Sequence, residues 1–315
     1  LQRVVNWWCK SENLVAKDSS IALVEAESPS QIRDEFEFSG LSVVCTNPQT
    51  DSYADYRCDF ELWEVDSGFM MYIGCNVTYS KFFDDGTLRT FLTYGIDRQS
   101  LVDNNYGGLA LPTTLPISPM SPYYSKSLAA TYDYDEMRFI DAASKFRVPT
   151  NDKGVPRTLQ LLVNSDDSAR LRCARNIAAT LTELGLACET VESPTSVYEA
   201  RLQAANYDIY LGITKLPTTA DLSEFYRPWG EMSWGGLANE TIYNMVNQSL
   251  ADRGNYYNLH KLVADDGRII PVMAGYYAIY AKRGVLSDLN PARDNVFYYT
   301  LGKTMESSKV ATQFS

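Results

Sequence analysis

The sequence predicts an α/β protein, and three features of its pattern lead to that class. Between Thr158 and Leu211, three short apolar runs alternate with two helical segments, which is the β-α-β-α-β order of an open sheet with crossover helices. Residues 20–45 show a strand–helix–strand order. Residues 268–280 form a longer apolar and aromatic run of strand type.

The first of these segments in the chain is expected to form a strand at 20–26, a helix at 28–38 and a strand at 40–45. The sequence Ser28-Pro29-Ser30 is a helix-start signal, and Gly40 follows the expected helix end. A βαβ unit of this type pairs its two strands in parallel, so we expect a parallel pair here.

The next segment, residues 70–124, begins with an uncharged apolar run at Met70–Cys75 that predicts a buried strand. A helical segment follows from Asp85, with apolar side chains every three to five residues up to Leu101, and Gly107–Gly108 ends it. Four prolines then predict an extended loop. Because that loop is not of low complexity, we expect it to be held against the protein.

The middle of the chain gives the clearest alternation. A helix is expected at 133–146, and further strands and helices are expected at 158–163 (strand), 169–184 (helix), 188–191 (strand), 193–204 (helix) and 207–211 (strand). The sequence Asn164-Ser-Asp-Asp-Ser168 is an N-cap cluster, and Gly185 is a helix stop.

Residues 215–239 form a long loop rich in proline, glycine and aromatic residues, directly after an expected strand. Ligands of open α/β sheets bind beyond the carboxyl ends of the strands, so this loop is a candidate part of a site. Helices are expected at 240–250 and 255–264, and the polar tail is expected to be disordered after about Thr304.

Composition excludes several classes of function. The net charge of −11 and the pI of about 4.7 oppose nucleic-acid binding, which requires a basic face. No apolar run reaches the about 18 residues that a membrane helix requires. With His260 as the single histidine and six cysteines at no zinc spacing, no metal site and no cofactor are expected.

The sequence also contains none of the common nucleophile, phosphate-loop or dinucleotide motifs, so we assign no catalytic residue and expect no enzyme. Cys45 and Cys58 flank a polar loop and are candidates for a disulfide, with buried free thiols as the alternative.

Residues 70–108 contain an ordered set of motifs: Tyr72, Gly74, Asn76, Phe83–Asp84, Arg89, Gly95-Ile96-Asp97-Arg98 and Gly107–Gly108. This order resembles the family 5 extracellular solute-binding proteins, the oligopeptide- and dipeptide-binding receptors of ABC importers. The resemblance extends from about Trp7 to Tyr280. It departs from the family pattern at Gly95, where the family usually has alanine.

The resemblance implies a periplasmic-binding-protein-like type II lobe, with a mixed sheet flanked by helices, and an incomplete part of a first lobe. Residues 1–68 would be part of lobe I, truncated at its N-terminus, 69–270 would be lobe II, and 271–315 would return to lobe I and end in the tail. The rest of lobe I is expected upstream of Leu1.

The implied function is binding without chemistry: two lobes close around a peptide or a related small solute. The implied partners are ABC permease subunits, and a monomer is expected. The implied location is extracellular, either periplasmic or anchored at the cell surface as a Gram-positive lipoprotein, with the signal and anchor outside this sequence. Because part of lobe I is absent, we expect this chain alone to bind peptide weakly or not at all.

Two alternatives remain open at this point. The same lobes occur as ligand-sensing modules of regulatory or signalling proteins. The ligand is alternatively not a peptide but a nickel chelate, a sugar or an opine.

Seven residues are candidates for ligand contacts. Tyr72 and Asn76 lie where a strand meets a loop, and a cleft-wall role competes with plain strand packing. Tyr123 is a candidate for the cleft rim. Trp229 and Trp234 lie in the long aromatic loop, where lining a cleft competes with packing of the loop itself.

Thr218 aligns with the acidic residue that, in the family, pairs with the α-amino group of the peptide, and it has no charge. Asp221 or Glu224 would have to replace that partner, since a buried ammonium requires one. The alternative for Asp221 is capping of the turn that follows. Arg98 is interpreted as a structural residue, with a carboxylate clamp as the alternative.

Overall fold

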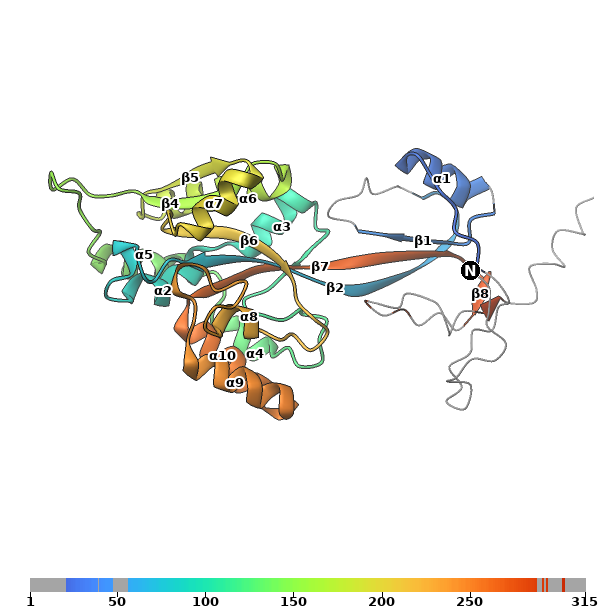
Figure 1. The fold of residues 1–315 in the computed structure, drawn as a ribbon. Helices are drawn as coiled ribbons and strands as arrows, with labels where there is room; N and C mark the ends of the chain where they lie inside the picture. Colours follow the sequence, from blue (N-terminus) through green and yellow to red (C-terminus); the bar gives the residue numbers. More distant parts are fainter. Residues whose placement is uncertain are drawn as a thin grey trace, which may run out of the picture. The chain divides into compact units, whose positions relative to one another are not determined.

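Figure 1 shows a computed structural model of the chain, which describes residues 21–38, 40–47 and 56–287, together with 291, 293, 302 and 303. The chain forms two compact units. Unit 1 consists of residues 1–67 and 276–315, and unit 2 of residues 68–275. The lobe boundaries expected from the sequence stay a prediction.

The sheet of unit 2 is mixed. Its strands follow the order β7-β2-β6-β4-β5, and the short strand β3 pairs with β7. Strand β4 is parallel to both β5 and β6, whereas β2 is antiparallel to β6. The bounds are β2 Phe60–Cys75, β3 Leu111–Pro112, β4 Leu159–Asn164, β5 Cys188–Ser193, β6 Ile209–Lys215 and β7 Ile269–Lys282. The β-α-β-α-β prediction is therefore confirmed.

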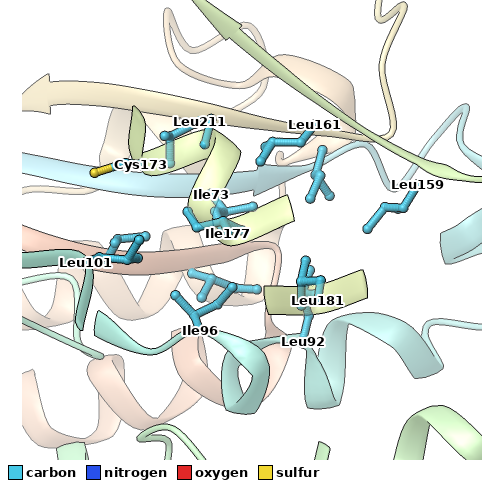
Figure 2. Packing of buried hydrophobic residues seen from close by; sticks show 14 of the residues in the cluster. Ile73, Leu92, Ile96, Leu101, Leu159, Leu161, Cys173, Ile177, Leu181 and Leu211 are labelled. Atoms are coloured by element: carbon cyan, nitrogen blue, oxygen red, sulfur yellow. The ribbon is translucent and has the colours of Figure 1, made fainter. Parts of the chain in front are cut away.

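The two faces of this sheet bury two different cores. Strand side chains alternate between faces, so Met71 and Ile73 of β2 enter one core and Met70 and Tyr72 the other. Core A, which contains Met71 and Ile73, is mainly aliphatic, and Figure 2 shows its packing around Ile73. Core B, which contains Met70 and Tyr72, is rich in tyrosine.

Each core is covered by its own helices. Core A receives side chains from α2 (Thr87–Phe91), α3 (Arg98–Tyr106), α5 (Glu136–Lys145) and α6 (Ser168–Glu183). Core B receives side chains from α7 (Thr195–Gln203), α8 (Ser223–Tyr226), α9 (Glu240–Ala251) and α10 (Tyr256–Asp266). The helices expected at 133–146, 169–184, 193–204, 240–250 and 255–264 are thereby confirmed with small shifts of their ends.

Helix α6 shows why its limits were predictable. Asp167 accepts a hydrogen bond from the Arg170 amide and caps the start. The buried side chains Cys173, Ile177 and Leu181 recur at the helical spacing. At the end, Gly185 has φ of +99°, and Leu186 N donates to Leu181 O at 2.9 Å, which is a glycine-type helix stop.

The helical segment expected from Asp85 is interrupted. Helix α2 is followed by a 3₁₀ turn, η3 (Leu92–Gly95), and α3 begins only at Arg98. Ile96 has an extended backbone, and the Asp97 side chain caps α3 by accepting from the Ser100 amide. The apolar spacing continued across the break because both helices pack on core A.

The proline-rich loop is held against the protein, as expected. Thr113 N donates to Val272 O at 3.2 Å, and Leu115 and Ile117 are buried in a small core with Leu128 of α4 (Lys126–Ala130). The loop forms consecutive turns after β3 and is not an extended segment, which corrects the expectation.

In unit 1, α1 (Pro29–Phe38) and β1 (Val43–Thr46) are described, and β8 (Leu286–Ser287) pairs with β9 (Gly302–Lys303). The strand expected at 20–26 is wrong over the described residues from Ile21 onward, where Leu23 and Val24 are exposed. The expected parallel pair is wrong too. Strand β1 pairs antiparallel with β7, a strand that the local pattern could not reveal as its neighbour.

Cys58 is a free thiol, as are Cys75, Cys173 and Cys188, so the proposed Cys45–Cys58 disulfide is not formed. The residues after Lys303, where disorder was expected, lie outside the described residues.

Candidate functional site

The carboxyl ends of β4 and β5 lie side by side in unit 2. Asn164, the last residue of β4, is the register partner of Ser193, the last residue of β5. Both side chains are buried. Helices α6 and α7 begin just beyond these ends (Figure 1). This carboxyl edge is the place where open α/β sheets bind ligands.

Hydrogen bonds tie the two helix starts together. Thr195 donates to Asp166 Oδ2 from its amide at 2.9 Å and from its hydroxyl at 2.7 Å. Asn164 Nδ2 donates to the same hydroxyl at 3.0 Å. These two bonds from Thr195 hold the pKa of Asp166 below its ordinary value. The edge is therefore a fixed arrangement.

Arg170, in the first turn of α6, places a buried positive charge at this edge. It is only 8% exposed, and its guanidinium lies 5.6 Å from the ring centre of Tyr198. The Nε atom is 3.5 Å from Asp167 Oδ2, but within the described part of the chain this buried Nε has no hydrogen-bond partner. Such a group can donate to a carbonyl or carboxylate oxygen of a ligand.

Tyr198 is held in place for this contact, because its hydroxyl donates to Leu211 O of β6 at 3.0 Å. Arg170 and Tyr198 were not among the ligand-contact residues predicted from the sequence. The available signal was the N-cap cluster 164–168 at the end of a predicted strand, which marks a helix start at a carboxyl edge.

The long loop after β6 crosses core B. It begins with Leu216, whose amide donates to Gly68 O at 2.9 Å. Phe225 packs against Tyr72, with ring centres 5.1 Å apart. The loop reaches the other end of β6, where Thr78 N donates to Gly235 O at 3.2 Å.

Tyr72 lies in core B and is 1% exposed. Its ring covers Gly212, its register partner on β6. Two residues further along the strands, Gly74 and Tyr210 are register partners, and the Tyr210 ring covers Gly74. A Cβ atom at Gly74 would lie 2.2 Å from the Tyr210 ring, so the two glycines make room for the two tyrosines. Burial raises the pKa of both hydroxyls. A ligand-binding role for Tyr72 stays a prediction.

Asn76 is completely buried at the amino end of β6, opposite the carboxyl edge. Its Nδ2 donates to Ala205 O at 2.9 Å and to Tyr207 O at 2.8 Å, and its Oδ1 accepts from Tyr79 N at 3.1 Å. The Asn76 side chain thus connects the turn after β2 to the loop that precedes β6. Ligand contact by Asn76 stays a prediction.

Thr218 is exposed, and Asp221 is half-buried. Asp221 Oδ1 accepts from Ser223 N at 2.8 Å and from Ser223 Oγ at 2.6 Å, which is the capping role expected as its alternative. Glu224 pairs with Arg227 at 2.8 Å. The residues that would have to replace the missing acidic anchor thus already have partners within their own turn.

The two loop tryptophans differ in environment. Trp229 is 97% exposed and has φ of +61°, in a tight turn where Glu224 accepts from Glu231 N at 3.0 Å. Trp234 is half-buried and packs on core B. The exposure of a side chain does not by itself show ligand contact, so ligand contact stays a prediction for both tryptophans.

Tyr123 lies on the surface beside α10. Its ring stacks on Tyr256 with centres 5.0 Å apart, and its hydroxyl accepts from Arg253 at 3.3 Å. The seven predicted residues are thus distributed over core B, the amino end of β6 and two surface loops. They do not form one cluster, and ligand contact by Tyr123 stays a prediction as well.

Within the described ranges, no group of three or more His, Cys, Asp or Glu side chains is placed to hold a metal ion. No helix among the same residues is long and apolar enough to cross a membrane.

Comparison with solved structures shows the fold. A putative peptide-binding protein AppA from Clostridium difficile matches with a TM-score of 0.72 at 15% identity, over 92% of this chain and 62% of its own. NikA from Brucella suis, in complex with Fe(III)-EDTA, matches with a TM-score of 0.68 at 14% identity, over 92% of this chain and 63% of its own. The oligopeptide-binding protein AppA from Bacillus subtilis, in complex with a nonapeptide, matches with a TM-score of 0.60 at 18% identity, over 78% of this chain and 53% of its own.

These relatives confirm the type II periplasmic-binding-protein fold that the resemblance implied. The chain spans less than two thirds of the length of each of them. No curated protein matches the sequence.

The family model for bacterial extracellular solute-binding proteins, family 5, middle part, matches residues 20–236, which is more than half of the chain. The chain therefore belongs to the family 5 bacterial extracellular solute-binding proteins.

Proposed function

We propose that this chain is the substrate-binding component of an ABC importer and that it binds peptides at the carboxyl edge of unit 2. Membership of family 5 supports a role in solute binding. The two AppA relatives, described as peptide-binding and oligopeptide-binding proteins, support peptide as the class of solute. The cleft between two lobes, the permease partner, the monomeric state and the surface anchor are parts of the same proposal.

The observation that supports this most strongly is that Arg170 is buried while its Nε has no hydrogen-bond acceptor among the described residues. A buried cation costs free energy unless acceptors surround it. The Arg170 Nε lacks an acceptor within the described part of the chain, and Asp167 is an ion-pair partner at 3.5 Å that also caps α6. The terminal carboxylate of a peptide has the charge and the planar geometry to meet a guanidinium.

The uncharged Thr218 favours a second candidate. Glu224 is paired with Arg227 and Asp221 accepts from Ser223, so both predicted replacements for the acidic anchor are already engaged within their own turn. An acidic solute without an amino group, smaller than a peptide, would suit Arg170 equally well. The complex of Brucella NikA with Fe(III)-EDTA shows that this fold accommodates a non-peptide ligand.

The experiment compares two arginines on one helix. Arg175 lies on α6 as well, but it is exposed and forms an ion pair with Glu192 at 2.7 Å. Binding of a mixture of short peptides would be measured by saturation-transfer NMR, which detects weak ligands. Arg170→Gln is expected to weaken binding about ten-fold, which corresponds to the loss of one charge-assisted contact. Arg175→Gln is expected to leave it unchanged.

Equal effects of the two substitutions, or none from either, would contradict the role of Arg170. Peptides that fail to bind the unchanged chain while small polycarboxylates do bind would select the second candidate.

A further inference from the structure

A second arginine of unit 2 is buried more deeply than Arg170. Arg98, the first residue of α3, is 1% exposed. Its Nε donates to Pro271 O at 2.9 Å, and its Nη1 donates to Thr93 O at 3.2 Å and Ile96 O at 3.3 Å. Its Nη2 donates to Thr93 Oγ1 at 2.8 Å. All four acceptors are uncharged.

The guanidinium has more donors than these acceptors use. It carries five N–H groups, so one N–H on Nη2 remains after the four bonds. Among the described residues, no carboxylate forms an ion pair with Arg98. Burial lowers the pKa of Arg98 to about 10, so the side chain is still charged at neutral pH. A full positive charge is thus buried with only uncharged hydrogen-bond acceptors, and the exposed carboxylate of Asp133 acts on it through space without a hydrogen bond.

This arginine lines a cavity of about 210 Å³. Lys126 and Asp133, which are both exposed, line the same cavity, together with Thr114 and Tyr124. Two cations and one anion give the cavity a net charge of one positive. Since a water molecule occupies about 30 Å³ in the liquid, the cavity has room for a small molecular anion with several waters.

The hydroxyls of Thr113 and Thr114 have no proton left to donate to an anion in the cavity. The Thr113 hydroxyl donates to Leu115 O at 2.9 Å, and the Thr114 hydroxyl donates to Ala129 O at 2.9 Å. Their protons are therefore already committed to backbone carbonyls, and these bonds fix the cavity wall. The remaining charged donors are Arg98 from within and Lys126 from the opening.

We propose that this cavity is a binding site for a small oxyanion, such as inorganic phosphate or a short carboxylate, held by Nη2 of Arg98 and Nζ of Lys126. The site is distinct from the carboxyl edge at Arg170, because the two sites share no residue. The oxyanion supplies a directly bonded negative charge, which Arg98 does not have among the described residues. Asp133 opposes it and keeps the affinity low.

The test uses two substitutions of opposite sign at the opening, where folding is not at risk. Phosphate binding to the whole chain would be measured by calorimetry, with ionic strength held constant by sodium chloride. Lys126→Gln is expected to weaken binding about three-fold, because it removes one partly screened attraction. Asp133→Asn is expected to tighten it by a similar factor while keeping an oxygen that can accept from Tyr134 N.

Two controls separate this site from others. Lys153→Gln changes an exposed lysine in the turn at 151–154 and is expected to have no effect. Arg170→Gln is also expected to have no effect, which keeps the outcome independent of the proposed peptide site. Acetate in place of phosphate identifies which class of oxyanion fits better.

The proposal is overturned if neither anion gives saturable binding. It is also overturned if Lys126→Gln and Asp133→Asn change the affinity in the same direction, or if Arg170→Gln alone abolishes it. Arg98 itself is left intact, because its four hydrogen bonds hold η3, α3 and β7 together and its loss would report on folding.

Discussion

The two ends of the parallel strands in unit 2 use their polar side chains differently. At the amino end, Asn76 is fully bonded, and Asp208 accepts from Ser80 Oγ at 2.5 Å and from Gln160 N at 3.0 Å. At the carboxyl end, Arg170 is buried with an unbonded Nε in the described part of the chain. Tyr207 at the amino end also buries a hydroxyl that has no hydrogen-bond partner among the described residues, so the difference lies in charge. It indicates that Asn76 and Asp208 stabilise the fold and that Arg170, the buried cation at the carboxyl end, is available for recognition.

The largest effect is expected from Asn76→Ala. This substitution removes both donors to the carbonyls of Ala205 and Tyr207 at a completely buried position. Buried carbonyls left without partners are costly, so the free energy of unfolding should fall by about 3 kcal/mol. Urea denaturation measures it, with Asn104→Ala, a change of an exposed residue of α3, as the control. A loss no larger than the control's would contradict a stabilising role for the amino end.

A smaller loss is expected from Asp208→Asn. Asparagine keeps one acceptor but replaces the other carboxylate oxygen by an NH₂ group, so either the Gln160 bond is lost or the Ser80 hydroxyl has to turn and accept from that NH₂ group. In both arrangements the charge-assisted bonds to the carboxylate are lost. The free energy of unfolding should fall by about 1–2 kcal/mol. The same denaturation measurement tests it. An unchanged value would mean that the two bonds contribute nothing at this end.

The matching substitution at the carboxyl end is Arg170→Met, which should cost no more than about 1 kcal/mol of unfolding free energy. Methionine keeps the packing against Tyr198, and the Asp167 carboxylate left behind is partly exposed and already caps α6. A loss as large as that of Asn76→Ala would show that Arg170 stabilises the fold, and the comparison between the two ends would fail.

The smallest effect concerns pH. Because hydrogen bonds from Thr195 hold the pKa of Asp166 below 3.8, its carboxylate stabilises the folded state above that pH. The contribution disappears as the pH falls through the lower folded-state pKa. The stability difference between the unchanged chain and Asp166→Asn should therefore be present at pH 7 and shrink in acid. Thermal melts from pH 7 to pH 2 measure it, and a difference that grows in acid would contradict the assignment.

The sequence was informative where local chemistry decides the structure. The strands and helices between Leu159 and Lys215 were predictable because Asp167 caps α6, Gly185 ends it, and apolar residues keep one spacing throughout. The antiparallel partner of β1 was not predictable, because β7 lies more than 200 residues away in the chain. The motif match that indicated the family used residues that pack the core, and Tyr72 and Asn76 are two of them.

The candidate site was less predictable for a related reason. Whether an arginine is exposed or buried depends on side chains from other elements. Arg170 and Arg175 lie on the same helix, yet Tyr198 of α7 packs against the first, and the second forms an exposed ion pair with Glu192 of β5. Trp229 shows the converse, because an aromatic residue expected to line a cleft or pack in its loop is 97% exposed.

The most direct test of the central claim is a double-mutant cycle between Arg170 and the ligand. Calorimetry would compare a peptide acid with its C-terminal amide on the unchanged chain and on Arg170→Gln. If Arg170 binds the carboxylate, amidation should weaken binding to the unchanged chain and have little effect on the variant, with a coupling energy of at least about 1 kcal/mol. Equal weakening of both proteins, which means a coupling energy of zero, would contradict the claim.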